Sequence, residues 1–247
     1  MMNITATSLN NTSIPVRRHK KVYVDTALKD KSSDIEQAVL AFEQKREARR
    51  IKDLRDTVSR IRSVPEEKCI DGNMLEMLEK IHLPNECIPC DLRRFDVLLK
   101  NRCISGVGYK NENGGISFFS LDIGGFTNIG APGITVFYNK ENRKSNSIYF
   151  FENFLDYIAF RYLMSIQKKT IDGDCLILNS LENFTTAMLH CENYRQVFCF
   201  FHRNVEASVV MCKTVCERMC GVSRDMSYIY GDKDFDTILD MIASLHK

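Results

Sequence analysis

The sequence lacks several of the patterns that identify common classes of protein. No apolar run approaches the roughly 20 residues that a membrane-spanning helix requires. The segment from Met1 to Pro15 is rich in Asn, Thr and Ser, without the basic start and apolar stretch of a secretory signal. No P-loop sequence of the Gly-Lys-Ser/Thr type is present. We therefore expect a cytoplasmic protein that engages no membrane and does not hydrolyse nucleotides through a P-loop.

A complete set of zinc ligands is also missing, although the chain contains 10 cysteines. Cys87 and Cys90 have Cys-x-x-Cys spacing, but a structural zinc site needs a full tetrahedral set of ligands. The other candidates nearby, Cys69, His82 and Cys103, have a spacing that fits no zinc ribbon or finger. Because the cysteines lie mostly within apolar runs, we expect buried free thiols in a reducing compartment. The role of Cys87 and Cys90 stays open.

Charge is distributed unevenly along the chain, although the formal net charge is only +2. Residues 1–62 contain 14 Lys or Arg and 8 Asp or Glu, a balance of +6, whereas residues 63–247 contain 20 and 24, a balance of −4. A basic arm on a mildly acidic body suits a polyanion such as DNA or RNA. The alternative is that these cations only solvate a long helix. The candidate nucleic-acid contacts in the arm are Arg46, Arg49, Arg50 and Lys52.

The N-terminal third of the chain predicts a tail followed by helices. Residues 1–31 are polar and aperiodic, which indicates a disordered tail with a small basic cluster. Residues 32–90 form a basic helical arm, because a capping box at 33–36 precedes apolar residues at three- and four-residue steps. A shorter helix around residues 74–81 completes this arm.

Residues 91–146 predict a small α+β region. The spacing of Leu92, Phe95, Leu98 and Leu99 indicates a helix. An Asn- and Gly-rich turn at 111–115 then lies between two apolar runs, which is typical of a β-hairpin. A further strand is expected at 134–138, after a loop rich in glycine.

Residues 147–247 predict an α/β domain, because short apolar runs alternate with amphipathic helices. Such alternation builds a parallel sheet with helices on both faces. The expected strands are 148–151, 175–178, 197–201 and 226–230, and the expected helices are 154–166, 181–190, 205–220 and 235–245.

Polar residues at the carboxyl ends of these strands are the candidates for a functional site, because ligands of open α/β sheets bind there. Glu152 follows the first strand, with Asp156 one helical turn later. This pair could hold Mg²⁺, which prefers oxygen ligands. The structural alternative is that Glu152 is a cap and Asp156 a solvated first-turn residue. The other strand-end residues are Asn153, Asn179, Ser180, His202, Arg203, Asn204, Asp232, Asp234 and Asp236.

Several of these segments resemble the TOPRIM-containing, primase-like proteins of mobile elements and conjugative transposons. The stretch Phe151–Asp156 is similar to the first TOPRIM motif, a hydrophobic strand that ends in Glu-Gly and leads to an aromatic residue and an Asp. The resemblance extends from about Leu98 to Leu239. The further segments that carry it are Gly108–Gly115, Gly130–Thr135, Leu178–Asn183 and Lys233–Asp236.

The chain departs from this family in two respects. It has the basic helix in place of the usual N-terminal zinc module, and the metal-binding Asp-x-Asp motif is degenerate, with Arg203 and Val205 in place of the aspartates. The family implies that Glu152 and that motif hold Mg²⁺ at a phosphodiester. We expect no bound metal or other cofactor here, because Arg203 would oppose a divalent cation. If Mg²⁺ binds, its ligands are Glu152, Asp156 and Asp234.

Two roles are open for Arg203, and three functions for the chain. Arg203 pairs with Glu152 in place of metal, since Arg suits bidentate carboxylate pairing, or it binds a nucleic-acid phosphate directly.

The first function is a catalytically degenerate TOPRIM-like protein that binds nucleic acid or assists mobile-element DNA processing, with Glu152 and Asp156 as the remnant of a catalytic site. The second is an active Mg-dependent primase or nuclease with a rearranged acidic site. The third is a non-enzymatic factor that docks on a protein through the helix of residues 33–62.

Overall fold

The computed structural model describes residues 16–140, 145–231 and 235–245, with side chains from residue 37 onward, and divides the chain into units of residues 1–50 and 51–247. Helix α1 (Val16–Ser59) has 44 residues and crosses this division. Of the tail predicted at residues 1–31, residues 1–15 lie outside the described residues and residues 16–31 belong to α1. The reason is that no Pro or Gly interrupts the chain between Val16 and Ser59. No helix among the described residues is long and apolar enough to cross a membrane.

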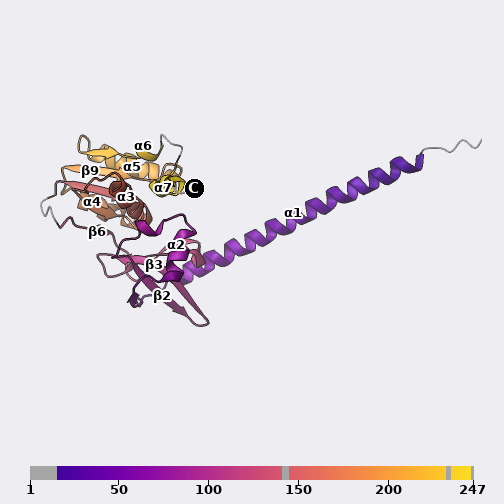
Figure 1. Cartoon of the computed structure of the whole chain (residues 1–247), viewed down its shortest axis with the longest axis horizontal. Helices are drawn as coiled ribbons and strands as arrows, with labels where there is room; N and C mark the ends of the chain where they lie inside the picture. The colour runs from indigo at the N-terminus through magenta and orange to yellow at the C-terminus, as the bar shows by residue number, and fades with distance from the viewer. Residues whose placement is uncertain (1–15, 141–144, 232–234, 246–247) are drawn as a thin grey trace, which may run out of the picture. The chain divides into compact units, whose positions relative to one another are not determined.

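The second unit contains an antiparallel sheet of five strands in the order β1-β2-β3-β4-β5. Strands β2 and β3 of this sheet are labelled in Figure 1. The predicted hairpin is present, since β3 and β4 pair around the turn at 111–115. The predicted helix at 92–99 is wrong, because this segment is strand β2. The strands are β1 (Glu67–Lys68), β2 (Arg93–Leu99), β3 (Arg102–Lys110), β4 (Ile116–Ser120) and β5 (Gly125–Ile129).

The last turns of α1 pack on this sheet. Val58 is fully buried in a core with residues of β2, β3 and β4, and Leu54 packs against the same core. The Arg55 side chain donates a hydrogen bond of 3.0 Å from Nε to the carbonyl oxygen of Ile123. That carbonyl belongs to a 3-10 turn (Leu121–Ile123), which ends at Gly124 with a φ of 64°. Arg55 therefore stabilises the fold and is not free to bind a polyanion.

A second sheet of five strands has the order β10-β9-β7-β8-β6. Strands β7, β8, β9 and β10 pair in parallel, whereas β6 runs antiparallel to β8. The strands are β6 (Thr135–Phe137), β7 (Ser147–Phe151), β8 (Asp174–Ile177), β9 (Gln196–Phe200) and β10 (Ser223–Asp225).

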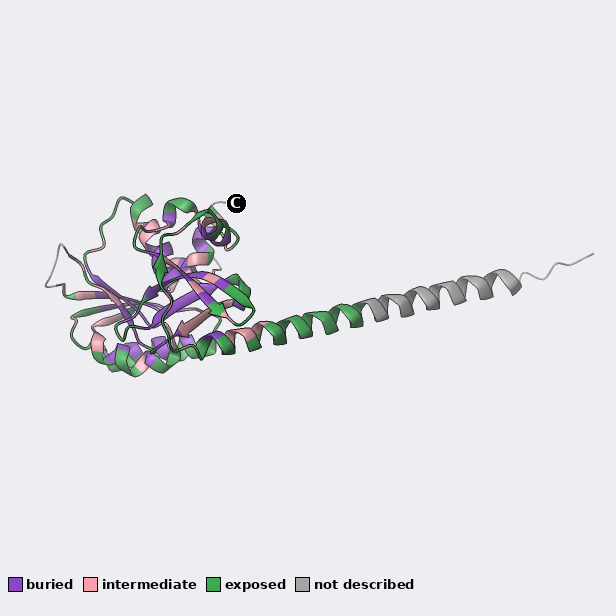
Figure 2. Ribbon diagram, turned by 90° about the horizontal axis from the view of Figure 1, so that it is seen from below, coloured by how far each residue is buried: buried purple, intermediate pink, exposed green. Residues whose placement is uncertain are grey.

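Helices cover both faces of the second sheet, and the burial along β7 shows how. Phe151 belongs to a core with α3 and α7, whereas Ile148 and Phe150 belong to a separate core with α4 and α5. This alternation follows from the two-residue period of a strand. All four residues of β8 and three of the five residues of β7 are buried, because helices cover both faces of these central strands (Figure 2). The helices are α3 (Phe154–Ile166), α4 (Phe184–Cys191, after a 3-10 turn at Leu181–Asn183), α5 (Glu206–Arg218) and α7 (Ile238–Leu245).

The last predicted strand is wrong. Residues 226–230 contain no strand, and Tyr228–Gly231 form the short helix α6. The fourth parallel strand is β10, which is short and polar and lies at the edge of the sheet. An edge strand of the sequence Ser-Arg-Asp has no apolar pattern from which it could be predicted.

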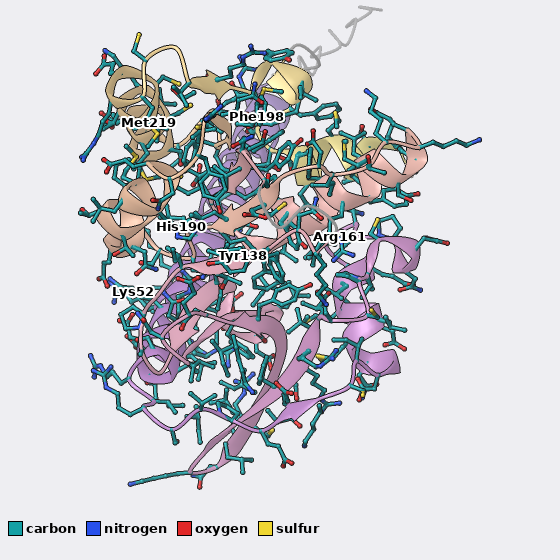
Figure 3. All side chains as sticks on the ribbon, turned by 90° about the vertical axis from the view of Figure 1, so that its left-hand side faces the viewer. Lys52, Tyr138, Arg161, His190, Phe198 and Met219 are labelled. Carbon is teal, nitrogen blue, oxygen red and sulfur yellow. The ribbon has the colours of Figure 1, made fainter. Side chains whose placement is uncertain are left out.

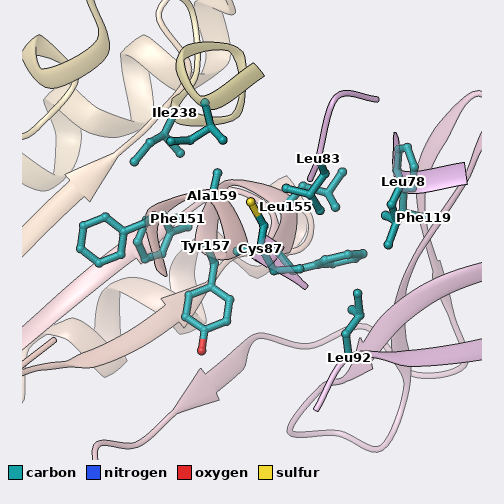
Figure 4. Close-up of a cluster of buried hydrophobic side chains, with 14 of the residues drawn as sticks. Leu78, Leu83, Cys87, Leu92, Phe119, Phe151, Leu155, Tyr157, Ala159 and Ile238 are labelled. Atoms are coloured by element: carbon teal, nitrogen blue, oxygen red, sulfur yellow. The ribbon is translucent and has the colours of Figure 1, made fainter. Parts of the chain in front are cut away.

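One core joins the two sheets. Phe119 of β4 and Leu78 of α2 (Gly72–Glu79) belong to the same buried cluster as Phe151, Leu155 and Ile238 (Figure 4). Helix α2 begins at the N-cap Asp71, whose side chain accepts a hydrogen bond of 3.1 Å from the backbone N–H of Met74. A 3-10 turn at Asn85–Cys87 places Cys87 in this core, and burial raises the pKa of its thiol to about 12. Cys87 is therefore a packed thiol, whereas Cys90 is exposed.

Candidate functional site at the ends of β7 and β9

The candidate site lies where the connections of the parallel sheet change face. Strands β7 and β9 are neighbours, but the helix that follows β7 covers one face of the sheet and the helix that follows β9 covers the other. A crevice forms at the carboxyl ends of two such strands, and ligands of open α/β sheets bind there. Glu152 directly follows β7, and His202 lies two residues beyond the end of β9. The topology therefore brings Glu152 and His202 together.

Asn153 organises the β7 side of the site as the N-cap of α3. Its side-chain oxygen accepts hydrogen bonds from the backbone N–H groups of Leu155 and Asp156 at 2.9 and 3.1 Å. Its amide nitrogen donates to Oδ2 of Asp156 at 2.6 Å. The residue has an extended backbone with a φ of −138°, so this position requires no glycine. Asn153 thus caps the helix and fixes the Asp156 carboxylate.

His202 holds the two acids together. Its ring Nε2 lies 2.7 Å from Oδ2 of Asp156, and its Nδ1 lies 3.9 Å from Oε2 of Glu152. Its backbone N–H also donates to Oε1 of Glu152 at 2.6 Å. The side chains are 23% exposed for His202, 14% for Glu152 and 3% for Asp156, so water screens these charges only partly.

His202 and Glu152 both have shifted pKa values. Burial alone lowers the pKa of His202, but the hydrogen bond and charge of Asp156 and the charge of Glu152 outweigh it and raise the pKa to about 9. Burial raises the pKa of Glu152, opposed by the charge and backbone hydrogen bond of His202 and by a hydrogen bond from Ser208. The Ser208 hydroxyl donates to Oε2 of Glu152 at 2.8 Å. At neutral pH the ring is therefore an imidazolium between two acids.

The expected pair between Arg203 and Glu152 is wrong. The Arg203 guanidinium donates instead from Nη1 to the carbonyl oxygen of Gly231 at 2.8 Å, and the backbone N–H of Arg203 donates to the carbonyl of Asp236. The guanidinium lies against Gly231 so closely that a Cβ at that position would collide with it. His202 is one of the strand-end residues in the sequence, but the order of residues does not show which side chain faces Glu152. The prediction therefore chose Arg203 as the partner of Glu152.

The residues present do not fit a divalent cation. The groups nearest Glu152 and Asp156 are an imidazolium and N–H and hydroxyl donors, and positive charge repels a metal ion. Among the described residues, no group of three or more His, Cys, Asp or Glu side chains could hold a metal. Asp232 and Asp234, the further acids considered for Mg²⁺, lie outside the described residues. A rearranged site that uses Asp234 stays a prediction.

Of the basic residues predicted to contact nucleic acid, Arg203 follows β9 and the other four lie on α1. Arg46, Arg49, Arg50 and Lys52 are exposed, and Lys52 is labelled in Figure 3. Arg50 makes an ion pair with Glu47, with a distance of 2.8 Å from Nε to Oε2. Arg46 and Arg49 are three residues apart and therefore share a side of the helix.

Asn179 and Ser180, which follow β8, line a polar cavity of about 400 Å³, and the backbone N–H of Asn179 donates to the backbone carbonyl of Glu152 at 3.0 Å. Arg62 and Glu182 also line this cavity. Asn179 has a left-handed backbone with a φ of 64°, and its amide nitrogen donates to the carbonyl of Gly133 at 2.9 Å. Asn179 therefore ties the end of β8 to the loop before β6.

No family model matches the chain, and no curated protein matches it. The chain is similar in structure to the primase fragment of the bacteriophage T7 primase-helicase protein, with a TM-score of 0.42 and 12% sequence identity. The similarity covers 70% of this chain and 66% of that fragment, slightly less than two thirds of its length.

Proposed function

We propose that the protein is a primase-like, nucleic-acid-binding protein whose acidic site performs no metal-dependent phosphoryl chemistry. The observation that carries this proposal is the contact of the His202 ring with Asp156 and Glu152, whose acids raise the pKa of His202 to about 9. The resemblance to TOPRIM-containing, primase-like proteins supports a role as an accessory factor in mobile-element DNA processing in the cytoplasm.

The charge at the strand ends supports the absence of metal chemistry. In the family that the sequence resembles, three carboxylates attract Mg²⁺, and the metal stabilises the charge of the phosphodiester. Here Arg203 and Val205 replace two of those carboxylates, and a protonated His202 offsets one of the two charges of the Glu152–Asp156 pair. Such a site attracts a divalent cation less strongly than three carboxylates do.

The exposed cations of α1 are the proposed contacts to nucleic acid. Arg46, Arg49 and Lys52 are exposed, so their side chains can reach phosphates without loss of a packed contact. Arg50 is the weaker candidate, since binding a phosphate requires it to leave Glu47. Phosphate contacts of this kind release counterions and make the affinity depend on salt.

The test is fluorescence anisotropy with a labelled 30-nucleotide single-stranded DNA at increasing salt. The wild-type protein should bind with an affinity that falls as salt rises, and the Arg46→Gln/Arg49→Gln variant should reduce the magnitude of the slope of log K against log salt by about 1.4. The matched control Lys80→Gln/Lys100→Gln removes the same charge at exposed positions elsewhere and should leave the slope unchanged. Binding that is absent at low salt, or equal in both double variants, contradicts the proposal.

A second candidate function is protein docking through the helix of residues 33–62. Val39, Leu40 and Phe42 are 52%, 56% and 66% exposed, which is unusual for three neighbouring large apolar side chains. Docking through them would survive high salt, in contrast to phosphate binding.

Sedimentation velocity in 1 M salt tests the simplest case, self-association of the chain. Dimers that dissociate in a Phe42→Ser variant support this candidate, and a monomer at every concentration counts against that case.

A further inference from the structure

Three cysteines meet on the face of the second sheet that α4 and α5 cover. Cys199 lies in β9 and is fully buried, and Cys212 lies in α5 with 7% of its surface exposed. Cys216 is one helical turn further along α5 and is half-buried. Cys199 and Cys212 belong to one buried cluster, Cys216 packs against it, and the Cys199 thiol interacts with both other thiols. The three sulfur atoms therefore form one contact cluster between a strand and a helix.

A cavity gives solvent access to this cluster. It has a volume of about 420 Å³, and its wall includes Cys212 and Cys216 but not Cys199. Two cationic side chains, Arg203 and Lys213, line the same cavity. Asp225 lines the cavity as well, and its charge acts to raise the pKa of Cys216. A small molecule that enters the cavity can reach the Cys216 sulfur.

The contacts between the thiols favour a thiolate at Cys216 and a protonated thiol at Cys199. The hydrogen bond from Cys199 is the main cause that lowers the pKa of Cys216 to about 6, with a further hydrogen bond from Ser223, while burial opposes the shift. The contacts with Cys212 and Cys216, together with burial, raise the pKa of Cys199 well above its usual value. At neutral pH Cys216 is then largely a thiolate, and Cys199 stays a thiol in contact with it. A thiolate open to solvent beside a second thiol is the arrangement typical of redox-sensitive cysteines.

We propose that Cys216 is an oxidation site for small hydroperoxides and that Cys199 converts the oxidised form into a disulfide. The Cys216 sulfur attacks the peroxide O–O bond, forms an S–O bond and is oxidised to the sulfenic acid, while the leaving oxygen takes a proton and departs as water. The Cys199 sulfur then attacks the Cys216 sulfur, an S–S bond forms, and the sulfenic oxygen leaves as a second water with the Cys199 proton. One hydrogen peroxide and two thiols thus give one disulfide and two waters.

The sequence allows the linkage to be identified directly, because trypsin separates the three cysteines. Cleavage after Arg195, Arg203, Lys213 and Arg218 places Cys199 in fragment 196–203, Cys212 in fragment 204–213 and Cys216 in fragment 214–218. The folded full-length protein is treated with hydrogen peroxide, its remaining thiols are blocked in denaturant, and unreduced tryptic peptides are analysed by mass spectrometry. The expected product is fragment 196–203 linked to fragment 214–218, absent before treatment.

Two variants keep the test independent of any loss of folding. Cys212→Ser should still form the Cys199–Cys216 link, and Cys220→Ser, at an exposed cysteine two residues beyond the end of α5, should form as much of it as the wild type. Cys216→Ser should yield no disulfide that contains Cys199. The proposal is overturned if Cys216 is linked to Cys212 instead, or if Cys216 stays a free thiol after the exposed Cys220 has been oxidised.

Discussion

His202 should make the stability of the protein depend on pH in a defined direction. The folded-state pKa of about 9 lies above the usual value of 6.5. The resulting stabilisation is fully present below pH 6.5 and is lost as the pH rises through 9. A difference of 2.5 pKa units corresponds to about 3 kcal/mol. The acids that face the ring are Asp156, Glu152 and Asp240.

A His202→Asn variant removes this contribution while the remaining titrations cancel in the comparison with the wild type. We expect its loss of unfolding free energy, measured by urea denaturation, to be about 3 kcal/mol larger at pH 6 than at pH 10. His82→Asn is the matched control, because His82 is exposed and has a left-handed backbone that Asn tolerates. Its effect should be the same at both pH values. An equal loss in His202→Asn at pH 6 and pH 10 would refute the proposed imidazolium.

Further predictions concern the supports of the site and its core, each measured as a change in the urea midpoint at constant m-value. Asn153→Ala removes the N-cap of α3 and should cost about 1 kcal/mol, and a loss below about 0.3 kcal/mol would contradict the capping role. Gly231→Ala should cost about 1–3 kcal/mol because the new methyl group displaces Arg203, so a neutral result would mean that the guanidinium lies elsewhere. Phe151→Ala should cost about 3–5 kcal/mol, whereas Leu98→Ala, at a side chain that is 80% exposed, should change little; equal effects would contradict the core assignment.

The second sheet could be predicted largely from the sequence because its central strands are buried on both faces. Such strands appear as apolar runs, and β7, β8 and β9 lie within one residue of the predicted runs. The same reasoning failed for β10, a polar edge strand, and for β2. In β2, Phe95 and Val97 are buried and Leu98 is exposed, a two-residue alternation, but the spacing of Leu92, Phe95 and Leu99 also matches a helix.

The site could be located from the sequence, but its contacts could not be assigned. Glu152, Asp156, His202 and Arg203 all follow strands whose order and direction place them at one edge of the sheet. Whether His202 or Arg203 contacts the acids depends on the directions of the side chains after β9. The Arg203 guanidinium packs against Gly231 and hydrogen-bonds to its carbonyl, so it does not contact Glu152. The capping role of Asn153 could have been predicted, because Asn is a preferred residue directly before a helix.

The most direct test of the central claim is a calorimetric titration of the protein with Mn²⁺ at pH 7, since Mn²⁺ substitutes for Mg²⁺ at carboxylate sites. If His202 occupies the acid pair as an imidazolium, the wild type and a Glu152→Gln variant should both show no binding in the micromolar range. Micromolar binding by the wild type that disappears in Glu152→Gln would show that these acids still hold a metal, and would contradict the account.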